Sequence, residues 1–261
     1  MRLLILAVAG SAVVLGGVAA RPYFGSSSGL PDPPIAGSSV GLTERSEAWI
    51  DTVARAGSIE QAEAMATLSA ILLASDHELA TRAAVLIGAL LADKRVAPEV
   101  RFVAADHLLT RLSMRIDTGA RWSVGVDVVA ARSLDRLTRS DDGASVYRQR
   151  LHELCAGQKP HPSLAVRVEC AATVLELTTE AARTDDVTKS TTGFLLAVLR
   201  TETPDEGKSP RTWPRITTLA WVKTRSAETL ARWTGTKNLF RPDGPWAHET
   251  EEANRLEALL K

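Results

Sequence analysis

The sequence of 261 residues has little of what several protein classes depend on. Two cysteines are too few for a disulfide-dense scaffold, and the low aromatic content, 5%, argues against a β-sheet protein. The 31 basic and 31 acidic side chains cancel, so no nucleic acid is expected as a partner. With 45% hydrophobic and 24% charged residues, the composition is that of an ordinary globular domain rather than a disordered or polytopic membrane chain.

A long apolar run lies at the N-terminus, where 14 of the 18 residues from Leu3 to Ala20 are hydrophobic. It follows Arg2 and ends in small residues, which is the pattern of an export signal. The run is also just long enough to span a bilayer as an uncleaved anchor. Residues 1–20 are therefore predicted to be a signal peptide or an N-terminal membrane anchor. Both alternatives place the rest of the chain outside the cytoplasm, in the periplasm or tethered to the membrane.

Residues 21–42 contain 13 Pro, Gly or Ser residues among 22. Such a composition buries little apolar surface, so we predict a flexible linker over 21–42 and a folded domain over 43–261.

The folded region shows apolar residues at steps of three and four, separated by short segments rich in glycine, proline and helix-capping residues. This pattern predicts ten helices, near residues 44–56, 58–74, 77–92, 98–112, 122–139, 144–156, 163–182, 188–201, 215–234 and 247–260. Capping boxes are predicted at Ser58 with Gln61 and at Ser75 with Glu78. The chain is therefore predicted to be all-α.

Two segments at an offset of 66 residues, 100–105 and 166–171, have similar sequences, VRFVAA and VRVECA. Two periods near 33 residues would give that offset, which indicates helix-pair repeats that stack to complete a core.

Residues 82–98 combine an alanine-rich helix, an Asp93-Lys94-Arg95 turn and a proline that opens the next helix, and this stretch resembles a HEAT repeat. Residues 230–244 resemble the terminal module of exported bacterial HEAT-repeat proteins. The similarity covers about two thirds of the chain, but it departs from the family's pattern at Leu91-Ala92 and over residues 113–139. The resemblance implies stacked antiparallel helix pairs that form an α-α superhelix, a HEAT-like or armadillo-like array. It also implies a binding or scaffolding surface without catalytic residues.

Cys155 and Cys170 lie on consecutive predicted helices. A disulfide between them in an oxidising compartment would stabilise the domain by about 3 kcal/mol. Two buried thiols that act as small apolar side chains are the alternative, and both interpretations stay open.

Motifs with a known chemical role are not apparent in the sequence. The five histidines lack the HExxH or i, i+4 spacing of a helical metal site, and neither a phosphate-binding loop nor a dinucleotide-binding turn occurs. We therefore predict no catalytic, cofactor-binding or metal-binding residues and no cofactor.

Arginine and tryptophan concentrate near the C-terminus, where residues 200–241 hold nine Lys or Arg against four Asp or Glu. Four of the six tryptophans lie in the last 49 residues, and Trp221 is expected to stack with Arg225 on one helix face. Clusters of arginine and tryptophan occur at binding hot spots, and they also pack the end caps of helical arrays. A binding surface and a packed end cap therefore both remain possible interpretations. The candidate partner-binding residues are Arg211, Arg215, Trp221, Arg225 and Arg232.

The first functional hypothesis is a non-catalytic helical-repeat module that binds or scaffolds an unknown protein outside the cytoplasmic membrane. It would contact the membrane only through an uncleaved N-terminal segment. The alternative is a binder of, or an enzyme acting on, a small anionic ligand in a cleft near the basic, Trp-rich C-terminal end. A self-associating structural array is a third possibility.

Overall fold

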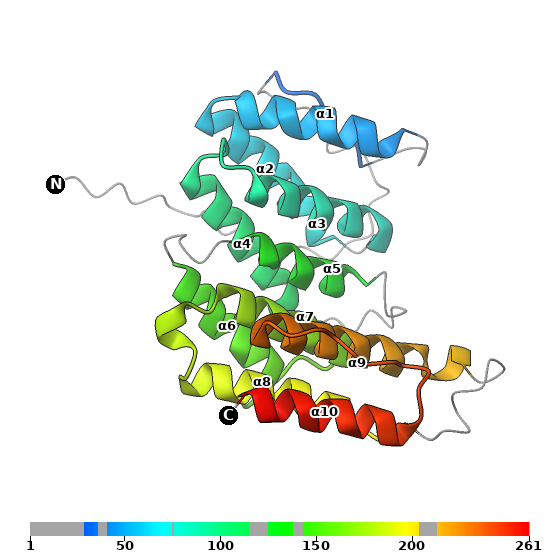
Figure 1. Ribbon diagram of the computed structural model, residues 1–261. Helices are drawn as coiled ribbons and strands as arrows, with labels where there is room; N and C mark the ends of the chain where they lie inside the picture. Colours follow the sequence, from blue (N-terminus) through cyan, green and yellow to red (C-terminus); the bar gives the residue numbers. More distant parts are fainter. Residues whose placement is uncertain are drawn as a thin grey trace.

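The computed structural model describes residues 29–35, 41–74, 76–114, 125–137, 143–203 and 213–260, with the backbone alone for 213–218. These residues form ten α-helices and two 3-10 turns, without a strand among them (Figure 1). The odd-numbered helices are α1 (Leu42–Arg55), α3 (His77–Ala92), α5 (Val126–Ser133), α7 (Leu164–Leu177) and α9 (Trp213–Thr234). The even-numbered helices are α2 (Ser58–Leu72), α4 (Pro98–Ser113), α6 (Ala144–Ala156), α8 (Asp186–Leu199) and α10 (Trp246–Leu260), and the turns are η1 (Leu134–Arg136) and η2 (Glu180–Ala182). The prediction of an all-helical chain is confirmed for the described residues.

The helices pack in two layers. Each odd-numbered helix packs on the next odd-numbered one, from α1 through α9, and each even-numbered helix packs on the next even-numbered one, from α2 through α10. Most helices also pack across the layers on their neighbours in sequence, as α6 does on α7. Figure 1 shows the resulting stack with α1 at one end and α10 at the other.

Helices within one layer run parallel, as the spacing of their contacts shows. On α7 and α9, Glu169 pairs with Arg225 and Glu176 pairs with Arg232, and both pairs are separated by 56 residues. In the other layer, the Tyr147 hydroxyl of α6 donates to the Phe102 carbonyl of α4, 45 residues earlier, and Arg150 pairs with Asp106, 44 residues earlier. A near-constant offset means that the two helices of each of these pairs advance in the same direction. The contacts of Gln61 near the start of α2 with Arg95 after the end of α3, and of Arg148 near the start of α6 with Thr178 after the end of α7, show that these consecutive helices run antiparallel.

The two similar segments, 100–105 and 166–171, lie in different layers, because the first belongs to α4 and the second to α7. Equivalent helices of a two-helix repeat would share a layer, so the predicted repeat equivalence is wrong. The likeness has a simpler cause, since both segments supply buried small residues to the core, such as Ala104, Ala105 and Ala171.

Two predicted helices are shorter than expected. The helix predicted over 163–182 ends at Leu177, because Thr178 takes an extended conformation. The Thr178 hydroxyl donates to the Val174 carbonyl and accepts from Arg148 Nε. The helix predicted over 122–139 is α5 followed by η1, and its outer parts lie outside the described residues. The bounds of α3 and α6 agree with the prediction.

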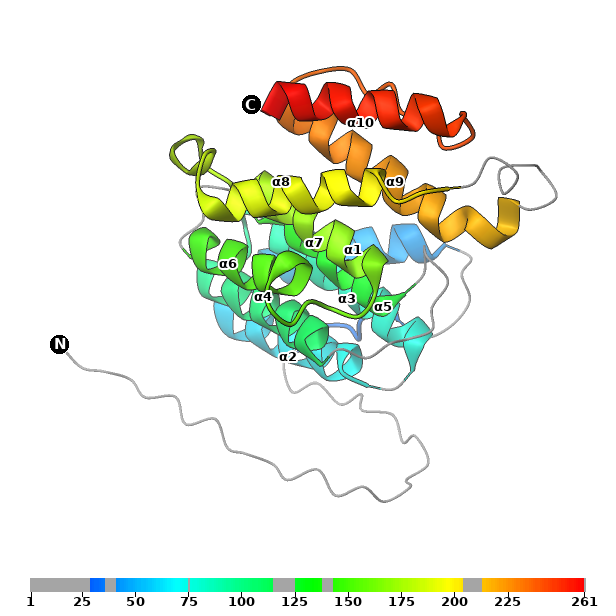
Figure 2. The same cartoon turned by 90° about the horizontal axis from the view of Figure 1, so that it is seen from below.

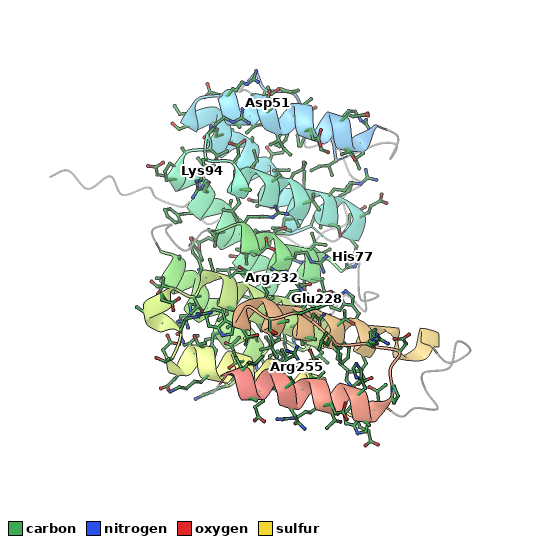
Figure 3. All side chains as sticks on the ribbon, viewed as in Figure 1. Asp51, His77, Lys94, Glu228, Arg232 and Arg255 are labelled. Carbon is green, nitrogen blue, oxygen red and sulfur yellow. The ribbon has the colours of Figure 1, made fainter. Side chains whose placement is uncertain are left out.

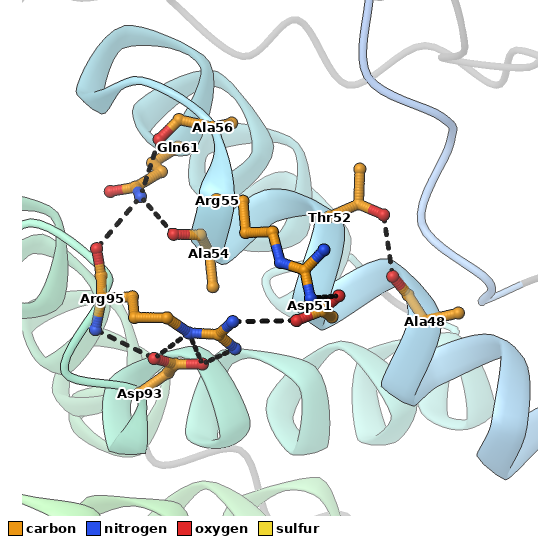
Figure 4. A network of polar contacts seen from close by, with 9 residues as sticks. All are labelled: Ala48, Asp51, Thr52, Ala54, Arg55, Ala56, Gln61, Asp93 and Arg95. Atoms are coloured by element: carbon orange, nitrogen blue, oxygen red, sulfur yellow. Dashed lines mark hydrogen bonds and ion pairs between the residues drawn. The ribbon is translucent and has the colours of Figure 1, made fainter.

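The predicted capping box at Ser58 does not form, because Gly57 is the N-cap of α2 without a side-chain hydrogen bond. Gln61 is instead buried, donates to the carbonyls of Ala54 and Ala56, and accepts from Ala97 N–H at 2.8 Å. It thereby joins the α1–α2 turn to the α3–α4 turn (Figure 4).

The predicted Asp93-Lys94-Arg95 turn is held by its own charges. The Arg95 guanidinium donates to the carboxylates of Asp93 in the turn and Asp51 on α1 (Figure 4). These hydrogen bonds lower the pKa of both aspartates. At the start of α3, the observed cap is Asp76, which accepts from Leu79 N–H at 2.9 Å; Ser75 lies outside the described residues.

Part of the predicted linker is packed on the domain. Ile35 is 1% exposed within the core, and its carbonyl accepts from Arg82 of α3 at 2.6 Å. The Pro31 carbonyl accepts from the Trp49 indole at 2.8 Å. Residues 29–35 are therefore fixed against α1 and α3, which the Pro, Gly and Ser content of the segment did not predict. Residues 1–28, including the predicted signal segment, lie outside the described residues.

Within the described part of the chain, no helix has the length and apolar character needed to cross a membrane.

Candidate functional site

A hollow of about 440 Å³ lies where α5 and α9 pack on either side of α7. We call it the α9 groove; it is lined by Arg132, Asp135, Trp221, Thr224, Arg225, Glu228 and Arg232. The α9 residues recur at steps of three and four, so they form one stripe along the helix. Figure 3 labels two of them, Glu228 and Arg232, and Figure 2 views the stack from its α10 end.

Three of the five predicted partner-binding residues line this groove: Trp221, Arg225 and Arg232. Arg211 lies outside the described residues, and the side chain of Arg215 is not among the described side chains. The helical spacing on α9 was readable from the sequence. The opposite wall, Arg132 and Asp135, was missed because α5 lies in the region where no repeat could be aligned.

Two arginines that line the groove belong to an ion-pair cluster that we call the guanidinium clamp: Glu169 of α7 with Arg132 of α5 and Arg225 of α9. The Glu169 side chain is fully buried. Its Oε1 accepts from Nη2 and Nε of Arg132 at 2.6 and 3.2 Å, and its Oε2 accepts from the same two atoms of Arg225 at 3.1 and 3.2 Å. A buried carboxylate needs such partners, and this one ties three helices together.

Neither clamp arginine uses its Nη1 group on any described residue, since their hydrogen bonds all go to Glu169 through Nε and Nη2. The Arg132 side chain is 46% exposed and that of Arg225 is 18% exposed. The clamp thus presents unused donors to the groove from both walls.

The aromatic contact differs from the expected one. Trp221 was expected to stack with Arg225, but that guanidinium is held by Glu169. The Arg132 guanidinium of α5 lies over the Trp221 ring instead, 5.8 Å from its centroid. A contact between α5 and α9 was not predictable from helical spacing within α9.

Asp135 faces the clamp from η1. Burial raises the pKa of this carboxyl, while Arg136 and Arg225 act to lower it and the carboxylates of Glu169 and Glu176 add to the increase. Its Oδ1 lies 3.2 Å from Arg136 Nε, is buried and accepts no hydrogen bond from either clamp arginine. Asp135 therefore stays outside the hydrogen bonding of the clamp.

A smaller hollow of about 70 Å³ continues along α9 and shares Arg232 with the groove. At its far end Trp233 is partly buried against the core, and the Arg183 guanidinium lies 4.4 Å from the ring centroid. From Trp221 to Trp233 the helix rises about 18 Å. The two hollows together present arginines and one tryptophan near each end.

A second buried polar cluster lies elsewhere in the core. Arg111 of α4 donates to Asp127 Oδ1 of α5 at 2.8 Å, and His161 Nε2 lies 3.5 Å from Asp127 Oδ2. His161 Nδ1 accepts from Ser163 N–H, so Nε2 is the ring nitrogen that faces Asp127. All three side chains are at most 3% exposed, so the cluster lies in the core and not at the surface. The cluster therefore connects α4, α5 and the α6–α7 loop.

Cys155 and Cys170 are both buried free thiols on α6 and α7. Burial raises the pKa of Cys155 to about 12 and raises that of Cys170 as well, so neither forms a reactive thiolate near neutral pH. In this structure they pack as small apolar side chains.

Among the described residues, no group of three or more His, Cys, Asp or Glu side chains is arranged to hold a metal ion. In comparisons with known proteins, the chain matches no protein-family model, no curated protein and no solved structure at a significant level.

Proposed function

We propose that the chain is a non-catalytic, HEAT-like helical-repeat protein that binds another protein through the α9 groove. In this proposal the two layers curve into an α-α superhelix. The parallel order of the helices within each layer supports it, because stacked antiparallel helix pairs are the unit from which such arrays are built.

The observation that carries the proposal is that the α9 groove brings together arginines with unused Nη1 donors and the ring of Trp221. Arginine and tryptophan are the residues most enriched at protein-binding hot spots, and here they come from two helices that are far apart in sequence. Trp221 and Trp233 bracket a length of about 18 Å, which suits five or six residues of an extended segment.

The alternative occupant is a small anionic ligand. A volume of about 440 Å³ lies within the range of small-molecule sites, and three arginines line it. We favour a protein because the hollow continues past Arg232 toward Trp233.

The proposed location is outside the cytoplasmic membrane, in the periplasm or tethered to it. The apolar run and the small residues at 1–20 support this location, and membrane contact would involve only that segment.

Affinity capture with the full chain from an envelope extract tests the proposal. The wild type should retain a stoichiometric protein, Arg232→Glu should lose it, and Lys94→Glu should keep it. Arg232 and Lys94 are both exposed, but Lys94 lies in the α3–α4 turn, away from the groove (Figure 3). Equal retention by both variants, or retention of nothing by the folded wild type, would reject the proposal.

A further inference from the structure

We propose that the partner inserts a single carboxylate side chain into the α9 groove, where the free Nη1 groups of Arg132 and Arg225 bind it. This inference rests on the proposed function and adds the chemistry that the groove recognises.

The charges of the clamp are unbalanced. Two guanidinium groups share the one carboxylate of Glu169, and the nearest further carboxylate, Asp135, makes no hydrogen bond to either of them, so both arginines keep unused Nη1 donors. A second carboxylate on the open side would give two guanidiniums and two carboxylates, with each arginine bonded on both edges. Guanidinium groups bind carboxylates through pairs of parallel N–H donors, so the exposed edge is suited to this ligand.

The clamp is already in place before a ligand arrives. Glu169 fixes Arg225 and Arg132 through two hydrogen bonds each, so little side-chain freedom remains to be lost. Arg225 is also largely buried, and donors in such surroundings interact more strongly with a charge than donors in water do. Preorganised donors of this kind raise affinity by lowering the cost of ordering.

The carboxylates around the groove limit the charge of the ligand. Asp135 and Glu228 line its walls, and Glu176 lies beyond them, paired with Arg232. A single negative charge matches the unbalanced charge of the clamp, whereas a dianion such as a phosphate group would be repelled by the two rim carboxylates. The structure therefore favours a Glu or Asp side chain over a phosphorylated one.

The test is an NMR titration of the full chain with a pentapeptide that is blocked at both ends and carries one central Glu. The readouts are the side-chain N–H signals of Arg132, Arg225 and Trp221. The Glu peptide should move all three, and its Gln twin should move them at least about tenfold less at equal concentration, since hydrogen bonds between charged groups are the stronger ones. A phosphoserine peptide should bind no better than the Glu peptide.

Two rim variants and one clamp variant give the sign of the effect. Asp135→Asn and Glu228→Gln remove rim charges without touching Glu169, and each should tighten binding of the Glu peptide by about threefold or more. Arg132→Lys keeps the charge against Glu169 but removes the Nη1 donor, and it should weaken binding about tenfold. Unfolding curves of each variant show whether it is folded.

Equal shifts with the Glu and Gln peptides, or no shift at a concentration of about 10 mM, would overturn the inference. So would weaker binding by Asp135→Asn. If the captured partner still depends on Arg232 while the Glu peptide fails, the inference alone is wrong. If the dependence on Arg232 fails as well, the proposed function is wrong too.

Discussion

Replacing Glu169 by Gln tests the structural role of the guanidinium clamp. The substitution keeps the shape of the side chain and removes its charge. It leaves Arg225, which is 18% exposed, without a counter-charge beneath the groove, while Arg132, at 46% exposed, can turn to solvent. The glutamine amide also places an NH2 group where one of the two carboxylate oxygens was, so both hydrogen bonds to that atom, two of the present four, are lost.

The cost follows from these exposures. Removing one partner of a fully buried ion pair destabilises a protein by about 3–5 kcal/mol. Since one of the two arginines reaches water, we expect the lower end, about 3 kcal/mol. With an m value of about 2–3 kcal/mol per molar urea, the unfolding midpoint should fall by about 1 M or slightly more.

The chain offers a matched control on the same helix. Glu176→Gln removes the same charge one heptad later and breaks the equivalent pair with Arg232, but here the side chains are 37% and 62% exposed. Exposed pairs contribute about 0–1 kcal/mol, so this variant should unfold almost as the wild type does. Equal losses for the two variants, or a loss below about 1 kcal/mol for Glu169→Gln, would refute the account of the clamp.

Three further predictions concern the framework that holds the groove. Lys223→Ala should destabilise the protein by about 3–5 kcal/mol in urea unfolding, because it removes the ammonium group that donates to the buried Glu249 carboxylate at 2.7 Å. A loss below about 1 kcal/mol would show that the fold does not need this pair. Gly88→Ala should lower the free energy of unfolding by about 1–3 kcal/mol, because the added Cβ would lie 2.7 Å from Ser133 Cβ. Gly193→Ala is the control: an added Cβ there has nothing within 4 Å, so this variant should stabilise α8 by up to about 1 kcal/mol. The opposite order of the two stabilities would contradict the α3–α5 packing. Arg148 lowers the pKa of Asp185, so the stability this pair gives is present above about pH 4 and is lost as the pH falls further. Asp185→Asn should flatten that part of the stability profile, and an unchanged profile would contradict this role of the pair.

Helix positions were predictable from the sequence because apolar spacing, glycine and proline report on local structure. The limits of α3 and α6 illustrate this, since each lies between recognisable turn residues. Contacts between distant segments were not predictable. The expected stack of Trp221 on Arg225 was based on helical spacing alone. In the structure, Glu169 of α7 pairs with Arg225, and Arg132 of α5 lies over the Trp221 ring.

Other errors have the same origin. Gln61 fits a capping pattern within its own helix, but the burial of the α3–α4 turn against α2 gives its amide better partners. Ile35 stands in a segment whose average composition indicates a linker, yet one apolar residue after two prolines is buried in the core and fixes that segment to the domain. The likeness of residues 100–105 to 166–171 reflects shared burial rather than shared position.

The central claim is that the α9 groove binds the partner protein. It is tested most directly by placing a photo-crosslinking amino acid at position 228 of the full chain, with position 94 as the control, and irradiating cells that express each variant. Both side chains are exposed, and only Glu228 lines the groove. We predict one discrete adduct from position 228 and none from position 94. The same adduct from both positions, or an adduct from position 94 alone, would contradict the account.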